Sequence, residues 1–420
     1  MSTLQLVDVE RWPGVARVPV SPVRAAMARR VLRNAARGLP VVVTLPDGTR
    51  LGAGGAGAPV MEIVSDAFFH RIGADLKIGF GEAYMAGDWW AGHGTDLAEL
   101  LTVFATRLTE LVPLVLQRFR KLVEQRIPVS DDNNRTGALA NISHHYDLSN
   151  QLFATFLDDT LTYSSAWFSS YDGGFASLAD AQRRKVEGIL DLAGVHAGSR
   201  VLEIGTGWGQ LAIQAARRGA TVSSITLSAE QRDLARKRIA EAGVAERVTV
   251  DLRDYRDVDG QYDAVVSVEM IEAVGERYWP AYFATVDRVL APGGKFGLQS
   301  ITMPHDRLLA TKHAHGWIHK YIFPGGLIPS LTAIDQVAAT AGGLQVTSRR
   351  DLGADYAHTL RLWRNRFTSQ ADVVASLGFD PTFRRMWELY LAYSEAGFRS
   401  GYLGVSQLAL ERLGQTSRGA

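Results

Sequence analysis

The sequence predicts an α/β protein. We expect a Rossmann-like, doubly wound domain, preceded by a smaller N-terminal α/β domain and ending in a helical cap. Between residues 200 and 302, short apolar runs alternate with helical stretches, as in a parallel sheet covered by helices. A glycine-rich loop follows the first of these runs. The 420 residues are 46% hydrophobic and 21% charged, an ordinary globular composition.

The chain is expected to divide at a polar segment rich in turn-forming residues. Residues 1–128 predict the smaller domain. Residues 129–141 predict a linker, because Asp, Asn, Thr and Gly favour turns over regular structure. Residues 142–420 then form the larger domain.

Four stretches outside the sheet carry local signals. Residues 21–38 predict a basic helix with a proline near its start and a glycine at its end. Residues 40–52 predict a hairpin that turns at an Asp-Gly pair. Residues 110–125 predict a helix that is apolar and then basic. Residues 386–410 are aromatic and predict a further helix.

The charge balance excludes some functions. Lys and Arg (45) nearly cancel Asp and Glu (44), so no overall field attracts nucleic acid. Between Arg11 and Arg37, however, there are seven arginines and no acidic residue. The chain has no cysteine, which excludes disulfides and thiolate ligands, and no metal site is expected. We find no signal peptide and no apolar run of about 18–20 residues, so we expect a cytoplasmic protein, soluble or peripheral to a membrane.

The larger domain contains five short predicted strands with helical stretches between them, such as residues 229–243. Ligands of such folds bind beyond the carboxyl ends of the strands. The predicted strands cover residues 200–207, 221–228, 247–254, 262–269 and 295–302.

The loop in "VLEIGTGWGQ" suggests a cofactor. Glu203 precedes Gly205, Gly207 and Gly209, and glycines let a backbone turn sharply and approach a ligand. The spacing is G-x-G-x-G, and no acidic residue ends the second strand, which argues against a dinucleotide. The loop resembles the S-adenosylmethionine site of class I methyltransferases. A dinucleotide enzyme and a tight turn without a ligand remain alternatives from this loop alone.

Several stretches in order resemble the cyclopropane-fatty-acyl-phospholipid synthase family. They include "HHYDLSNQLFATFLDDTLTYSSAWF", "ITLSAEQ", "SVEMIEAVG", "YIFPGGLIPS" and "GADYAHTLRLW". The resemblance covers residues 141–410, and "IGFGEAYMAGDWW" at 78–90 extends it toward full-length synthases rather than the shorter mycolic-acid enzymes. It implies an S-adenosylmethionine-dependent enzyme that methylates the cis double bond of a phospholipid acyl chain. The cofactor residues that it implies are Tyr163, Ser164, Glu203, Gly205, Gly207, Trp208, Gly209, Gln210, Thr226, Leu227, Ser228, Gln231, Tyr255 and Arg256.

The resemblance also implies a bound bicarbonate ion as the base. Its ligands in the family correspond here to Glu272, Ile301 and Tyr356, with two departures: Ser165 replaces a cysteine and Gln299 replaces a histidine. Glutamine offers a neutral donor and cannot carry a positive charge, so the site should hold an anion less tightly. On this basis Glu272→Gln is expected to abolish turnover with cofactor binding nearly intact.

Glu269 adds a carboxylate three residues before Glu272. It either pairs with an arginine at the strand end or orients Gln299 in the site. Because the anion site is altered, we lean toward a methylene-branched product, which a separate reductase would convert to a methyl branch, over a cyclopropane. Aromatic faces can stabilise the intermediate cation. The candidates are Tyr163, Trp167, Tyr321, Phe323 and Tyr356.

The substrate that the resemblance implies lies in a bilayer, so we expect residues 1–128 to contact phospholipid at the inner membrane face and the helix at 386–410 to cap an acyl tunnel. A homodimer is a further expectation. Two other functions stay open. One is methylation of a soluble small molecule, and the other is a lipid-binding protein without turnover.

Overall fold

The computed structural model describes residues 7–107, 128, 132–135, 137–138 and 149–412. The chain divides into two compact units. The first contains Met1–Ile127, His313–Ile322 and Phe367–Tyr402, and the second contains the remaining segments, Pro128–Lys312, Phe323–Arg366 and Leu403–Ala420. The first unit therefore includes two segments that the sequence had placed in the larger domain. Among the described helices, none has both the length and the hydrophobicity to cross a bilayer.

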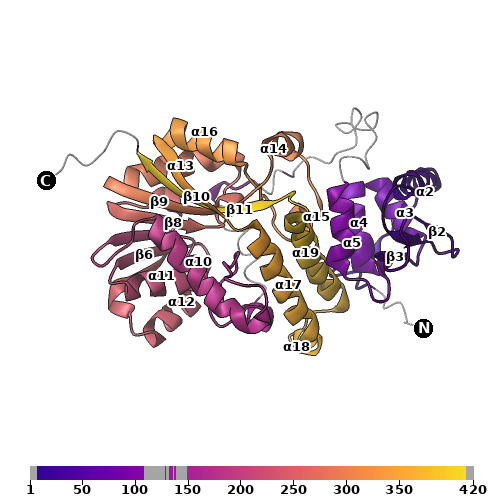
Figure 1. Ribbon diagram of the computed structural model, residues 1–420, viewed down its shortest axis with the longest axis horizontal. Coiled ribbons are helices and arrows are strands. Elements are labelled where there is room, and N and C mark those ends of the chain that lie inside the picture. The colour runs from indigo at the N-terminus through magenta and orange to yellow at the C-terminus, as the bar shows by residue number, and fades with distance from the viewer. Residues whose placement is uncertain (1–6, 108–127, 129–131, 136, 139–148, 413–420) are drawn as a thin grey trace. The chain divides into compact units, whose positions relative to one another are not determined.

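The first unit combines helices with a small sheet of order β2-β1-β3-β4 (Figure 1). The predicted hairpin is confirmed, because β1 and β2 pair antiparallel. The predicted basic helix is also confirmed, as α2. The elements are α1 (Pro13–Ala16), α2 (Pro22–Ala36), β1 (Val42–Thr44), β2 (Arg50–Leu51), β3 (Val60–Ile63), α3 (Ala67–Ala74), α4 (Leu76–Ala86), β4 (Trp89–Ala91), α5 (Leu97–Thr106), α15 (Trp317–Tyr321), α18 (Ala371–Ser376) and α19 (Pro381–Arg399).

The predicted helix at 110–125 lies outside the described residues. Of the expected linker, residues 132–135 and 137–138 are described. Asn133 donates to the carbonyl of Gly325 at 2.8 Å. Arg135 forms a bidentate ion pair with Asp257 at 2.6 and 2.7 Å. Both contacts lie within the second unit.

The second unit contains a sheet of order β10-β11-β9-β8-β5-β6-β7. All five predicted strands are confirmed. The strands are β5 (Arg200–Ile204), β6 (Thr221–Thr226), β7 (Val248–Leu252), β8 (Tyr262–Val268), β9 (Leu290–Thr302), β10 (Leu344–Asp351) and β11 (Gly404–Arg412). The helices are α9 (Asn150–Phe156), α10 (Leu178–Leu192), α11 (Gln210–Arg217), α12 (Ala229–Glu241), α13 (Trp279–Val289), α14 (His305–Thr311), α16 (Leu331–Gly342) and α17 (Gly353–Ser369).

Helices cover both faces of this sheet. Figure 1 shows α10, α11 and α12 on one face and α13 and α16 on the other. Each group closes a separate hydrophobic core with the strands. Strand β5 pairs in parallel with both β6 and β8. The order of the strands reverses at β5: β6 and β7 continue on one side of it, whereas β8 and β9 lie on the other side. The loops after β5 and β8 are therefore neighbours at the carboxyl ends of the strands, where ligands bind in such folds.

The C-terminal prediction was partly wrong. Helix α19 ends at Arg399, and residues 404–412 form β11, which lies antiparallel between β10 and β9. The sheet is therefore mixed rather than parallel. Gly401 has φ +71°, a conformation that ends the helix. Residues 405–410 are all buried, so β11 lacks the alternation of buried and exposed residues that identifies a strand with one exposed face.

Candidate active site

The glycine loop joins β5 to α11 and depends on left-handed backbone conformations. Gly205, Gly207 and Gly209 have φ values of +98°, +52° and +88°. A Cβ on Gly209 would lie 3.2 Å from the Cβ of Ala235, so this glycine allows the loop to pack on α12. A Cβ on Gly207 would meet no atom within 4 Å. The backbone of the loop is thus open on the side where a ligand can approach it.

Polar side chains surround this loop. Glu203, at the end of β5, is buried and accepts a hydrogen bond from Ser224 at 2.5 Å. Burial raises the pKa of Glu203 to about 8. Trp208 donates to Asn150 at 2.7 Å and Gln210 donates to Gln214 at 2.9 Å.

The next two strands contribute the other predicted cofactor residues. Thr226 donates to the side-chain oxygen of Gln231 at 3.0 Å, and Ser228 caps α12 by accepting from the Gln231 N–H. Leu227 lies half-buried between them. Arg256 is held by an ion pair with Asp254 at 2.6 Å. The hydroxyl of Tyr255 is buried and has no partner in the described part of the chain, although its ring packs on Tyr282.

These residues fit S-adenosylmethionine. The open loop at Gly207 admits close approach, and the buried Tyr255 hydroxyl offers a polar atom that no described residue satisfies. Ser164 is buried beside this region, and Tyr163 packs against Phe153 with ring centroids 5.2 Å apart.

The carboxylate of Glu269 collects three hydrogen bonds. The Ser165 N–H donates to Oε1 at 2.9 Å, and the Gln299 amide donates to the same oxygen at 2.8 Å. The Tyr356 hydroxyl donates to Oε2 at 2.8 Å. These donors lie before α10, in β9 and in α17, so three distant segments converge on one side chain. The sequence left open whether Glu269 pairs with an arginine or contacts Gln299, and the structure shows the second arrangement.

The backbone of Glu269 is unusual. Its φ is +49°, which non-glycine residues seldom adopt, and its N–H donates to the carbonyl of Gln299 at 2.8 Å. A left-handed residue at the end of β8 turns the side chain into the site instead of continuing the strand. Such backbone strain concentrates at functional sites.

Gln299 has a fixed orientation because Gln407 of β11 donates to its Oε1 at 3.0 Å. The Gln299 amide N–H₂ must therefore point at Glu269. Arg350 in turn donates to Gln407 at 2.9 Å. The sequence analysis did not identify Gln407, because the prediction placed it in a helix and only the register of β11 opposite β9 reveals it.

Glu272 lies on a short 3₁₀ turn, Ile271–Ala273. Its Oε1 accepts from the Ile301 N–H at 2.5 Å and from Ser300 at 3.0 Å. Its Oε2 is buried and has no partner among the described residues. Burial, and next the negative charge of Glu269, raise the pKa of Glu272 to about 8, so this group is mainly protonated at pH 7.

The residues present do not fit bicarbonate. The donors implied as bicarbonate ligands, from Ser165, Gln299 and Tyr356, already bind the Glu269 carboxylate. The Ser165 hydroxyl donates to the carbonyl of Ala166 at 2.9 Å rather than into the site. A second anion there would face the charge of Glu269 without these donors.

Lys185 of α10 is a second site residue that the sequence analysis missed. It is buried, and its ammonium donates to the Ser164 hydroxyl at 2.6 Å. No short motif marks it, because a lysine within a helix usually reaches solvent. Two of the aromatic candidates have other contacts: Trp167 lies under Arg350 at 4.1 Å, and Tyr321, in the first unit, donates to Glu82 at 2.7 Å.

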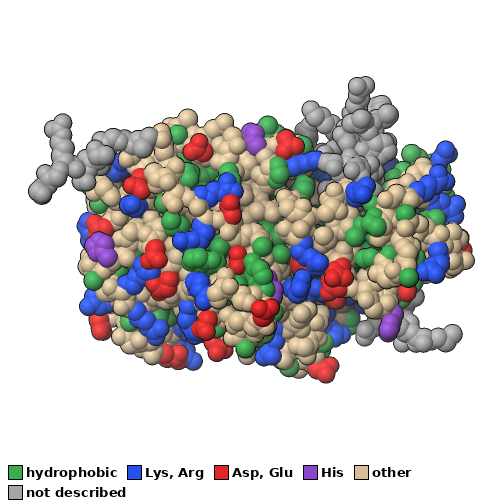
Figure 2. All heavy atoms as spheres, in the orientation of Figure 1, with side chains coloured by type: hydrophobic (Ala, Val, Ile, Leu, Met, Phe, Trp, Pro, Cys, Tyr) green, Lys and Arg blue, Asp and Glu red, His purple; other side chains and the backbone are tan. Residues whose placement is uncertain are grey.

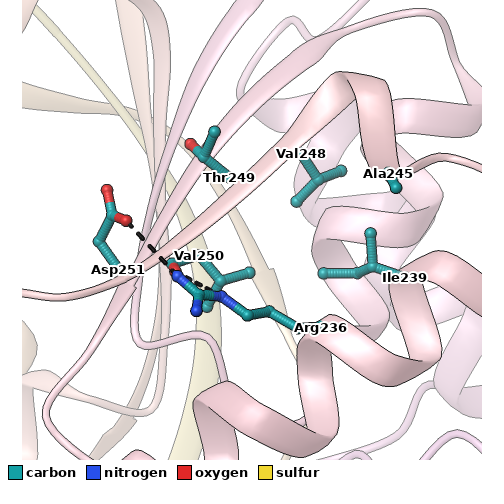
Figure 3. Close-up of a pocket in the computed structure, with 7 residues that line it drawn as sticks. All are labelled: Arg236, Ile239, Ala245, Val248, Thr249, Val250 and Asp251. Atoms are coloured by element: carbon teal, nitrogen blue, oxygen red, sulfur yellow. Dashed lines mark hydrogen bonds and ion pairs between the residues drawn. The ribbon is translucent and has the colours of Figure 1, made fainter.

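A shallow depression elsewhere on the second unit lies between α12 and β7 (Figure 3). Arg236 spans it and donates to the carbonyl of Val250 at 3.1 Å. None of the predicted site residues lines it. We assign it no function.

Comparison with known proteins identifies the family. Residues 133–408 match the family model described as mycolic acid cyclopropane synthetase. The chain is 53% identical to tuberculostearic acid methyltransferase UfaA1 of Mycobacterium tuberculosis, over 97% of each chain. It is 33% identical to the cyclopropane-fatty-acyl-phospholipid synthase of Escherichia coli K12, covering 82% of this chain and 86% of that one.

Solved structures agree. The mycolic acid cyclopropane synthase CmaA1, complexed with SAH and CTAB, has a TM-score of 0.59 and 30% identity, covering 65% of this chain and 97% of that one. The cyclopropane synthase MmaA2 from M. tuberculosis also gives a TM-score of 0.59, at 29% identity and the same coverage. The chain therefore belongs to the mycolic acid cyclopropane synthetase family of S-adenosylmethionine-dependent methyltransferases.

Proposed function

We propose that this enzyme methylates the cis double bond of an unsaturated, oleoyl-like phospholipid acyl chain, and that Glu269 removes the proton that must leave afterwards. The observation that carries the proposal is the placement of the Glu269 carboxylate on the donors of Ser165, Gln299 and Tyr356. The names of the relatives, a tuberculostearic acid methyltransferase and a fatty-acyl-phospholipid synthase, support a fatty acyl substrate.

The reaction requires a base and a dry site. S-adenosylmethionine, when bound, supplies an electrophilic methyl group. The alkene's electron pair forms the new C–C bond and leaves a cation on the neighbouring carbon. Glu269 is half-buried, and we place its carboxylate beside this cation, where the bound acyl chain would exclude water. Burial raises the pKa of Glu269, which makes it a stronger base than an exposed carboxylate, and its three hydrogen bonds hold it in place.

We propose the methylene product as the main outcome. A hydride with its electron pair shifts to the cationic carbon, so the positive charge moves to the methyl-bearing carbon. Glu269 then takes a proton from the methyl group, and the released electrons form an exocyclic C=C bond. Loss of the methyl proton without the hydride shift would close a cyclopropane instead. A separate reductase would convert the methylene group to a methyl branch.

Mass spectrometry of fatty acids tests the function. Expression in a host rich in oleoyl lipids should produce acyl chains heavier by one CH₂, and fragmentation after derivatisation should locate an exocyclic methylene. The Glu269→Gln variant, expressed in parallel, should produce far less of this product than the wild type. An unchanged acyl profile from soluble wild-type enzyme with bound cofactor would contradict the proposal and favour a soluble small-molecule substrate.

We also propose peripheral binding to the inner membrane face through α2. Val23, Met27 and Val31 of α2 follow helical spacing and are 73%, 62% and 41% exposed, and Val20, just before the helix, is 75% exposed. In Figure 2, Lys and Arg side chains gather at the end of the first unit that contains α2. An exposed apolar stripe beside arginines suits an anionic bilayer surface, where the apolar side chains enter the headgroup boundary.

Vesicle co-sedimentation tests this surface. Met27→Asp should weaken binding to anionic phosphatidylglycerol vesicles by roughly tenfold, because a charge replaces an inserted apolar side chain. Val373→Asp, at another exposed apolar position of the same unit (45% exposed), is the matched control and should bind as wild type does. Equal binding of both variants, or equal binding of the wild type to neutral and anionic vesicles, would contradict the proposal that α2 contacts an anionic membrane surface.

A further inference from the structure

Lys185 is a buried cation between the cofactor residues and Glu269. Its side chain is 1% exposed, and its ammonium donates to the Ser164 hydroxyl at 2.6 Å. Gln182, one turn earlier on α10, donates to the backbone carbonyl of Ser164 at 2.9 Å. One helix therefore fixes both the backbone and the hydroxyl of Ser164.

The hydrogen bond from Lys185 determines what the Ser164 hydroxyl can do. An ammonium group has three donors and no acceptor, so the Ser164 oxygen must accept. Its own proton is then free to be donated, and within the described ranges no acceptor takes it. A buried hydroxyl with an unused proton is suited to a carboxylate, and the amino-acid tail of S-adenosylmethionine carries one.

The charge of Lys185 also acts on Glu269. Burial lowers the pKa of Lys185 to about 8, against the opposing charges of Glu269 after β8, Asp158 after α9 and Glu203 on β5. In return, Lys185 lowers the pKa of Glu269, which burial raises. The other titratable groups that face Glu269 are Glu272 and Tyr356.

We propose that Lys185 is a positioning residue that aims the Ser164 proton at the cofactor carboxylate and supplies a positive counter-charge to the Glu269 carboxylate. This inference rests on the proposed function for the role of Glu269. In this proposal one side chain, Lys185, affects both the affinity for the cofactor and the basicity of Glu269. It does so without contact to the acyl chain or the transferred methyl group.

The proposal has two parts, a cofactor arm (Lys185 orients Ser164 toward the cofactor carboxylate) and a charge arm (Lys185 acts on Glu269). Calorimetry with S-adenosylhomocysteine, which has the same amino-acid tail, tests the cofactor arm without turnover. Lys185→Met and Ser164→Ala should each weaken binding by about tenfold, because each removes one link of a charge-assisted hydrogen-bond chain. The double variant should be no weaker than either single variant, since both act through one contact. Additive losses would overturn this arm. If Lys185→Met does not fold, Ser164→Ala alone decides it, and binding within twofold of wild type overturns it.

The pH profile of kcat at saturating cofactor tests the charge arm. In Lys185→Met, the acidic limb should move to higher pH by about one unit, because Glu269 loses the nearby cation that favours its ionised form. Ser164→Ala keeps that cation and should leave the limb in place. An unmoved limb in folded Lys185→Met would overturn the charge arm.

Gln182→Met is the matched control for a merely structural role. It removes the anchor of the Ser164 backbone from the same buried helix face and leaves the Lys185 charge intact. Its acidic limb should coincide with that of wild type, whereas an equal shift in both variants would overturn the inference. If wild type methylates no acyl chain, the proposed function fails, and the calorimetric cycle still decides the role of Lys185 toward the cofactor.

Discussion

Replacing Glu269 with glutamine is expected to lower kcat by roughly a thousandfold, within the range by which general bases accelerate reactions. The amide has nearly the shape of the carboxylate but cannot accept a proton at neutral pH. Binding of S-adenosylhomocysteine should change by less than about twofold, because the donors to the Glu269 carboxylate among the described residues are Ser165, Gln299 and Tyr356, and none of them belongs to the glycine loop. Single-turnover kinetics and calorimetry measure the two effects separately.

Glu272→Gln is the matched control, since it changes the other buried carboxylate of the same site. The family resemblance alone predicted that this change abolishes turnover. The structure predicts a smaller loss, roughly tenfold, because a mainly protonated carboxyl resembles an amide and the Ile301 N–H keeps its acceptor. A greater loss in Glu272→Gln than in Glu269→Gln would identify Glu272 as the base.

Gly207→Ala should weaken cofactor binding by roughly a hundredfold, because a methyl group forced into a closely packed contact costs up to about 3 kcal/mol. No protein atom lies within 4 Å of the added Cβ, so the fold has room for it. The methyl group would instead occupy space that the cofactor needs. The left-handed φ of +52° adds a stability loss of about 1 kcal/mol, which is independent of any ligand.

Gly343→Ala is the control that separates the loss of stability in Gly207→Ala from its loss of cofactor affinity. Gly343 ends α16 with φ +58°, and a Cβ there also meets no atom within 4 Å. It should lose the same stability as Gly207→Ala in thermal unfolding and keep wild-type affinity for S-adenosylhomocysteine in calorimetry. Equal affinities of the two variants would mean that the cofactor does not approach Gly207.

Much of the second unit could be predicted from local sequence. The strands from β5 to β9 are short apolar runs separated by glycines and capped helices, so each carries its own signal. Strand β11 could not be predicted in this way, because its apolar residues are buried on both faces and their period is hidden. Which segments of the chain form the first unit could not be predicted either, because this depends on contacts between segments far apart in the chain.

The site was predictable only in part. Motifs identified Glu269, Gln299 and Tyr356 one by one, but only tertiary contacts show that all three meet in one hydrogen-bond cluster. Lys185 and Gln407 belong to no motif, and their importance follows from burial and from the register of β11 opposite β9. The sequence suggested a weakened anion site, whereas the structure shows a site whose donors bind a carboxylate of the chain itself.

The central claim is that this enzyme carries its own base in Glu269. Turnover of wild-type enzyme in buffer freed of carbon dioxide and bicarbonate tests this claim most directly. The arrangement of Ser165, Gln299 and Tyr356 around Glu269 predicts an unchanged kcat and no response to added bicarbonate. A kcat that falls in the depleted buffer and recovers as bicarbonate is restored would contradict it.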